Sequence, residues 1–123
     1  MRIDEILRPQ RVSPVPNAPA WVEGVMNLRG AMVPVVDLRK RLAIAGAAPP
    51  RMKPKWLVTL VGRRKVALVV DGVSGVVRVT RAEIAPVPPF VTQGVNPAVI
   101  AACGPADRIK LLLNIKVLLR EAA

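Results

Sequence analysis

Residues 19–42 read PAWVEGVMNLRGAMVPVVDLRKRL, and this stretch determines how the rest of the chain is interpreted. Two short apolar runs, 24–28 and 31–38, lie on either side of the dipeptide Arg29-Gly30. Glycine tolerates the positive φ that a tight connection requires, and apolar runs of this length are typical of strands. The pattern therefore predicts a β-hairpin or a sharp strand corner at this dipeptide.

Three side chains of this stretch carry expectations of their own. Pro34 has no N–H to donate to a sheet, which predicts an edge strand or a bulge. Asp37 precedes a short basic segment and predicts the N-cap of one helical turn. Arg29 stands at a turn position that favours Asn or Asp. Its guanidinium is therefore expected to be solvated, to form a bidentate contact with a carboxylate, or to face a partner.

Short apolar runs separated by Gly and Pro continue along the chain. We expect strands at 56–61, 65–70, 73–80, 98–102 and 108–113. Asn114 precedes apolar residues at helical spacing and predicts a short C-terminal helix. Many short strands with little helix indicate a mainly β fold built from small barrels.

A segment rich in Gly, Ala and Pro, residues 43–54, predicts a join between two subdomains. The first would contain approximately residues 1–54 together with the C-terminal segment. The second would contain approximately residues 55–113. Both would belong to a single domain spanning residues 1–123, since a chain of 123 residues forms one domain or two small units with a shared core.

The composition favours a cytoplasmic protein without catalytic activity. Cys103 is the only cysteine and there is no histidine, so an internal disulfide and the commonest general base are both absent. The acidic residues are scattered, and no glycine-rich phosphate loop occurs. The longest uncharged stretch, residues 84–106, contains several prolines and does not suit a membrane helix. We therefore expect no catalytic residues, metal site, cofactor or membrane insertion.

The net charge of +11, from 19 basic and 8 acidic residues, points to anionic partners. Basic residues cluster at 39–41, 51–55 and 63–65. No aromatic residues are interleaved with these clusters, as base stacking would require, which favours a solvated basic face. A basic small β-barrel that binds nucleic acid is the alternative function, and steep salt dependence of binding would identify it.

Several motifs resemble one family in sequence order. They are Asn17 to Trp21, Asn27 to Gly30, Val33 to Arg39, Val69 to Ser74, Ile84 to Phe90 and Asp107 to Ile115. Together they resemble the CheW-like proteins, which are coupling adaptors of bacterial chemosensory arrays. The resemblance implies two SH3-like β-barrels packed together.

The family pattern usually begins with two more strands before the segment that matches residues 2–7. The resemblance therefore implies a first barrel that is incomplete at its N-terminus. A late start assignment, a natural truncation, or strand exchange in a homodimer would each account for this. An inert remnant that only dimerises is a third functional alternative.

The resemblance also implies a docking site for the cytoplasmic tip of methyl-accepting receptors. Matching positions for an apolar groove between the barrels are Ile3, Ile6, Gly24, Val73 and Val76. Glu5 and Arg29 align with a salt bridge at the edge of this groove. Val12 and Phe90 align with contacts to the regulatory domain of a CheA-type histidine kinase. Helix-in-groove recognition by branched apolar anchors would be the physical basis of receptor docking.

Overall fold

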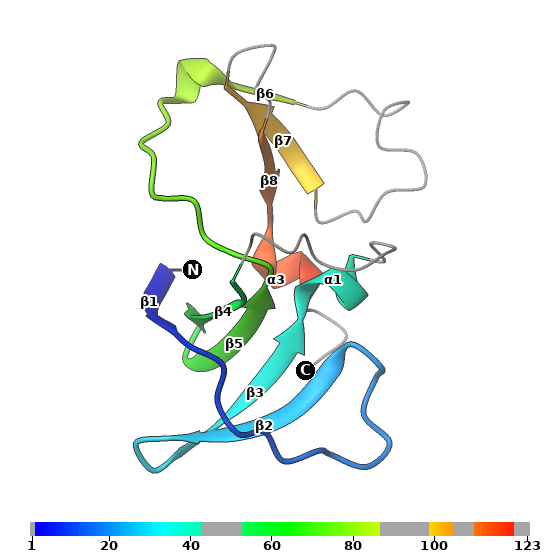
Figure 1. Cartoon of the computed structure of the whole chain (residues 1–123). Helices are drawn as coiled ribbons and strands as arrows, with labels where there is room; N and C mark the ends of the chain where they lie inside the picture. The colour runs from blue at the N-terminus through cyan, green and yellow to red at the C-terminus, as the bar shows by residue number, and fades with distance from the viewer. Residues whose placement is uncertain (1, 43–52, 87–98, 105–109, 120–123) are drawn as a thin grey trace. The chain divides into compact units, whose positions relative to one another are not determined.

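The computed structural model describes residues 2–42, 53–86, 99–104 and 110–119 (Figure 1). The chain divides into two compact units between Ser74 and Gly75. This division differs from the predicted one, which separated the subdomains at residues 54/55 and grouped the C-terminal segment with the first. The strands that follow residue 54 pair with those before the 43–54 segment and so belong to the same unit.

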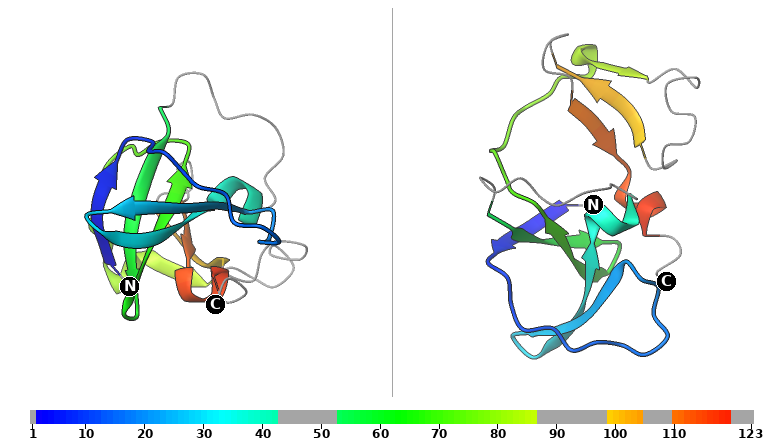
Figure 2. Two further views of the ribbon diagram at one scale, coloured as in Figure 1. Left: turned by 90° about the horizontal axis from the view of Figure 1, so that it is seen from below. Right: turned by 45° about the vertical axis from the view of Figure 1, so that its right-hand side comes forward.

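The first unit contains one five-stranded sheet in the order β1-β4-β5-β3-β2. Its strands are β1 (Arg2–Leu7), β2 (Val22–Leu28), β3 (Ala31–Asp37), β4 (Lys55–Val61) and β5 (Arg64–Val70). All neighbouring pairs are antiparallel except β3 and β5, which are parallel. The sheet curls strongly, as the left view of Figure 2 shows.

The described part of the first unit forms this sheet from five strands. Whether a further N-terminal hairpin or a strand of a second copy adds to this barrel stays a prediction. The core cluster consists of alternate residues of these strands. Its buried members are Met26, Val33, Val35, Trp56, Val58 and Ala67. The residues next to some of them, Val36, Thr59 and Leu68, are buried as well, so parts of both faces of the sheet are covered.

The β2–β3 hairpin confirms the predicted turn but not the predicted edge strand. β3 is an internal strand, because it pairs with β2 on one side and with β5 on the other. Pro34 lies opposite Val25, whose N–H and C=O bond to Ser13 rather than to β3, and the pairing of β3 with β5 begins only at Val35. The missing N–H of Pro34 therefore costs the sheet no hydrogen bond.

Helix α1 (Leu38–Arg41) follows β3 directly, and Asp37 caps it as predicted. The Lys40 N–H donates to the Asp37 carboxylate at 3.2 Å. The helix has no buried residue. Its three consecutive cations instead contact three different parts of the unit. Arg39 donates to Asp71 at 2.6 Å, Lys40 donates to Glu23 at 2.9 Å, and the Arg41 guanidinium lies 4.8 Å from the centre of a Trp21 ring.

Cluster 39–41 is engaged by contacts within the unit, although the Lys40 side chain stays 55% exposed to solvent. Each of its side chains is held by an anion or an aromatic ring of the same unit. The sequence could not show this, because Glu23 and Asp71 are distant in the chain.

The described part of the second unit contains a three-stranded sheet in the order β6-β7-β8. Its elements are the 3₁₀ turn η1 (Arg81–Glu83), β6 (Ile84–Pro86), β7 (Val99–Cys103), β8 (Lys110–Leu113) and helix α3 (Ile115–Leu118). Asn114 caps α3 as predicted, accepting from the Val117 N–H at 3.3 Å. The strand predicted at 73–80 does not form, because no sheet partner lies beside that segment in the described residues. The fold is mainly β, with two sheets in two units.

Candidate partner-binding site

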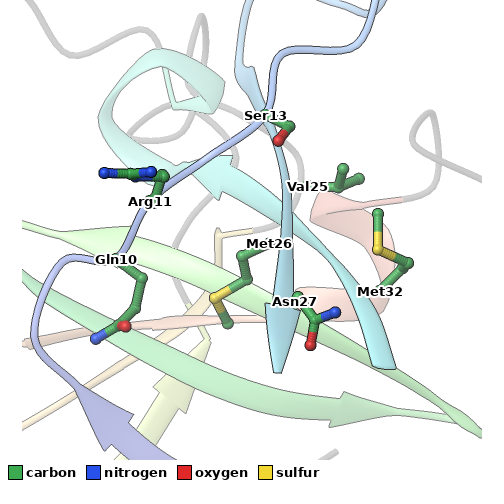
Figure 3. A pocket seen from close by; sticks show the side chains of 7 residues that line it. All are labelled: Gln10, Arg11, Ser13, Val25, Met26, Asn27 and Met32. Carbon is green, nitrogen blue, oxygen red and sulfur yellow. The ribbon is translucent and has the colours of Figure 1, made fainter. Parts of the chain in front are cut away.

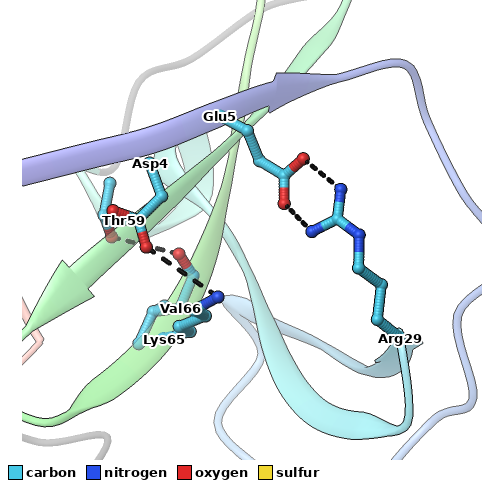
Figure 4. A network of polar contacts seen from close by, with 6 residues as sticks. All are labelled: Asp4, Glu5, Arg29, Thr59, Lys65 and Val66. Atoms are coloured by element: carbon cyan, nitrogen blue, oxygen red, sulfur yellow. Dashed lines mark hydrogen bonds and ion pairs between the residues drawn. The ribbon is translucent and has the colours of Figure 1, made fainter.

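The candidate site of the first unit is organised around an ion pair between Glu5 of β1 and Arg29 of the turn that follows β2 (Figure 4). Arg29 donates from both terminal nitrogens to the two carboxylate oxygens of Glu5, at 2.7 and 2.8 Å. Such a bidentate fork fixes the direction of both side chains, which a lysine could not do. Of the roles left open for Arg29 by the sequence, the structure shows the fork onto a carboxylate.

The β2–β3 turn places Arg29 for this contact. Arg29 has φ +51° and Gly30 has φ +88°, so both central residues are left-handed, as in a type I′ turn. The Gly30 N–H donates to the Asn27 side-chain oxygen at 2.9 Å, which secures the turn from within. A non-glycine residue in this conformation is uncommon, and at this position it aims the guanidinium at β1.

The electrostatics of the site follow from this pair. Hydrogen bonding from Arg29 holds the pKa of Glu5 below its ordinary value, and partial burial opposes the shift. The same bonds raise the pKa of Arg29. Nearby, the Lys65 ammonium lies 3.9 Å from the Asp4 carboxylate. The carboxylate of Glu5 and the guanidinium of Arg29 are therefore both charged throughout the neutral range.

Ile3 and Ile6 stand beside Glu5 on β1 and are about half exposed, at 52% and 47%. They pair with Thr59 and Leu57, which are two residues apart on β4. A register shift between Ile3 and Glu5 thus puts both isoleucines on one face, although their spacing of three would separate them in a regular strand. The structure brings Ile3, Glu5, Ile6 and Arg29 together at one edge of the unit.

Gly24 has a different surrounding from the one the sequence suggested. It has φ +145°, and a Cβ at this position would lie 2.2 Å from the Ser13 carbonyl oxygen and 2.7 Å from a Val12 methyl. The space beside the Gly24 Cα is thus filled by residues 12–13 of the same chain. Val12 is half-buried and packs against the core of the first unit.

The remaining predicted residues fall in less regular parts of the chain. Val73 is 41% exposed and belongs to the first unit, whereas Val76 is 93% exposed and belongs to the second. Neither lies in a strand or helix. Phe90 lies outside the described residues. A groove formed jointly by residues of both units stays a prediction.

The sequence did not single out a cavity beside β2 (Figure 3). Its lining includes Arg11, which belongs to no motif, and Asn27, which belongs to a family motif but received no predicted contact. The segment between β1 and β2 supplies Gln10, Arg11 and Ser13 to the lining. The departure of that segment from β2 is set by tertiary structure, so no local signal could have revealed it.

Two further observations concern the described residues alone. No group of three or more His, Cys, Asp or Glu side chains there could hold a metal ion. In those same parts of the chain, no helix has the length and apolar character needed to cross a membrane.

Comparison with known protein families gives a match over the whole chain. The CheW-like domain family matches residues 1–123, and the chain belongs to this family. It is 33% identical to the chemotaxis protein CheW of Klebsiella aerogenes over 97% of this chain and 71% of that protein. It is 42% identical to the CheW of Rhizobium meliloti over 76% of this chain, but spans only 59% of that relative.

Two further similarities extend the comparison. Protein FrzA of Myxococcus xanthus is 32% identical over 96% of this chain and 74% of its own length. The crystal structure of the scaffolding protein TtCheW from Thermoanaerobacter tengcongensis has a TM-score of 0.83 and 26% identity, covering 95% of this chain and 79% of that one. Family and fold are thus established together.

Proposed function

We propose that this chain is a non-catalytic adaptor of a bacterial chemosensory system, located in the cytoplasm. It would dock on the cytoplasmic tip of methyl-accepting receptors and couple them to a CheA-type histidine kinase. Membership of the CheW-like family supports the class of function. The observation that carries the docking site is the pair Glu5–Arg29 beside two half-exposed isoleucines on the same strand.

The physical basis is an apolar contact oriented by a charged pair. Ile3 and Ile6 present branched apolar side chains on one face of β1, as a helix-in-groove site requires. The fork of Arg29 onto Glu5 fixes β1 relative to the hairpin, and the Arg29 side chain stays 69% exposed. Apolar anchors supply affinity, and the charged border supplies orientation.

The decisive experiment is calorimetric titration with a receptor-tip helical hairpin at moderate salt. We expect saturable binding that Ile3→Glu weakens by at least about tenfold. The matched control is Val15→Glu, which introduces the same charge at an apolar residue of similar exposure outside the site. Equal loss in both variants, or no binding by the folded protein, would contradict the proposed site.

Kinase coupling forms the second half of the proposal, through Val12 and Phe90. Because Val12 packs against the core, a Val12 substitution would combine lost contact with lost stability. Phe90→Ala is therefore the better variant, tested by binding to the kinase regulatory domain with the thermal midpoint measured in parallel. Unchanged kinase binding by the Phe90 variant would remove this residue from the proposed contact.

The nucleic-acid alternative gains no support from the comparisons. One of its three basic clusters, residues 39–41, is occupied by contacts within the first unit.

A further inference from the structure

A cavity of about 300 Å³ lies at the free edge of β2, beside the segment that follows β1 (Figure 3). It is lined by Gln10, Arg11, Ser13, Val25, Met26, Asn27 and Met32. Residues 25–27 are consecutive, and their side chains alternate between the two faces of the strand. A cavity that touches all three therefore lies at the edge of the strand rather than on one face.

The backbone at this edge is only partly paired. Ser13 and Val25 exchange two hydrogen bonds, each of 2.9 Å, and form an isolated bridge. Groups that face one side of an antiparallel strand recur at every second residue, so the N–H and C=O of Asn27 face the same side as those of Val25. Within the described part of the chain, pairing along this edge ends at the bridge, which leaves the Asn27 groups facing the cavity.

The lining has one sign of charge. Arg11 is exposed, and no carboxylate stands among the residues that line the cavity. Met32, 66% exposed, and Val25 add an apolar surface, and methionine adapts its shape to varied contacts.

Gln10 and Asn27 add amide groups, and each amide has one hydrogen bond within the described residues. The Gln10 NH₂ donates to the Arg8 carbonyl at 2.8 Å. The Asn27 side-chain oxygen accepts from the Gly30 N–H at 2.9 Å. The second N–H of Gln10, the Gln10 oxygen and the Asn27 NH₂ remain for a ligand.

We propose that the edge of β2 at Asn27 binds an extended, acidic segment of a partner protein, which adds to the sheet as a short strand. Backbone hydrogen bonds to Asn27 supply register, a partner carboxylate binds Arg11, and an apolar partner side chain covers Val25 and Met32. Strand addition to an exposed edge needs alternating side chains, so the segment carries acidic and apolar residues in turn.

The occupant is a partner rather than a second copy of this chain. Two copies with a net charge of +11 each repel one another, whereas an anionic segment is attracted by the same field. The inference goes beyond the proposed receptor contact, because none of Ile3, Glu5, Ile6 or Arg29 lines this cavity.

The test uses a blocked peptide of alternating valine and glutamate, titrated into the isotope-labelled full chain and followed by NMR. We expect saturable shifts of the amides of residues 25–27 and slower hydrogen exchange at Asn27. The same peptide with consecutive N-methylated residues cannot donate to the strand and should not bind. Replacing glutamate by lysine in the peptide should weaken binding about tenfold, because a charge-assisted hydrogen bond is lost.

The variant Arg11→Glu tests the charge requirement from the side of the protein, by reversing the charge that faces the peptide. Arg11 is exposed, so this substitution should leave the fold intact, and it should transfer the preference to the lysine peptide. Equal binding of the methylated peptide, or shifts confined to other strands, would overturn the proposal. Concentration-dependent shifts at Asn27 without peptide would also overturn it, since a second copy would then be the occupant.

Discussion

Arg29 and Glu5 are joined by two hydrogen bonds of 2.7 and 2.8 Å, and they belong to opposite ends of the sheet order. β1 and β2 each have one neighbour in the sheet, and the ion pair links β1 to the turn that follows β2. In the described residues, β1 and β2 are not paired by backbone hydrogen bonds. The ion pair therefore connects two edges of the sheet that the strand pairing leaves separate. A turn residue in a left-handed conformation provides this connection.

Exchanging the charges of this pair tests its part in docking. We expect Arg29→Ala to weaken binding of a receptor-tip hairpin, since the loss of the fork frees β1 from the turn. The double variant Glu5→Arg with Arg29→Glu restores the opposite charges and should recover part of the affinity. Calorimetric titration of the single and double variants gives the coupling, and strictly additive effects would show that the pair does not act as a unit.

Acid should remove the contribution of the pair to stability. The Glu5 pKa is lowered from 4.5 chiefly by its hydrogen bond from Arg29, so the unfolded chain binds more protons than the folded one in this range. The contribution is present above the unfolded pKa and is lost as pH falls through the folded pKa. Urea midpoints should therefore fall more steeply for the unaltered chain than for Glu5→Gln between about pH 5 and pH 3. Parallel profiles would show that the pair does not stabilise the fold.

Gly24→Ala should destabilise the first unit by roughly 2–5 kcal/mol, through backbone strain and collision with Ser13. The matched control is Gly75→Ala. Gly75 has φ +152°, close to the +145° of Gly24, but a Cβ there would meet nothing within 4 Å. Urea unfolding of both variants isolates the contact, because the strain is common to both. Equal losses would mean that the 12–13 segment moves aside at no cost.

Asp71→Asn should cost about 1–3 kcal/mol, because the hydrogen bond from Arg39 loses its charged acceptor. Both side chains are only about one quarter exposed, at 22% for Arg39 and 26% for Asp71. The control is Glu23→Gln, which alters a pair that water reaches more easily. Urea unfolding should show a clearly smaller loss for the control, and a loss that is equal or larger would contradict the importance of burial here.

The sequence predicted local structure well wherever neighbours in the chain decide it. The turn at Arg29-Gly30, the cap at Asp37 and the cap at Asn114 all depend on groups within a few residues, and all three are confirmed. The positions of β2 to β5, β7 and β8 followed from apolar runs in the same way, whereas the run at 73–80 forms no strand. Pro34 was assigned to an edge strand or a bulge because its missing N–H can be read from the sequence, whereas the pairing of β3 with β5 cannot.

The differences between expectation and structure concern contacts between distant segments. Nothing near Arg39 in sequence indicates Asp71, and nothing near Gly24 indicates that Ser13 covers it. The boundary between the units was placed at a Gly- and Pro-rich segment, yet the parallel pairing of β3 with β5 carries the first sheet across that segment. Of the candidate site, family resemblance found the Glu5–Arg29 pair, but the cavity at the β2 edge depends on a divergence of backbones that no motif encodes.

Helix α1 has a consequence for how the first unit responds to temperature. Because the helix buries no residue and is held by ion pairs and a cation–π contact, its attachment owes little to the hydrophobic effect. Apolar attachments weaken on cooling, whereas charge pairs weaken with added salt. The core of the sheet and the attachment of α1 thus respond to different properties of the solvent. Cooling weakens the apolar packing of the strands, whereas added salt weakens the ion pairs that hold the helix.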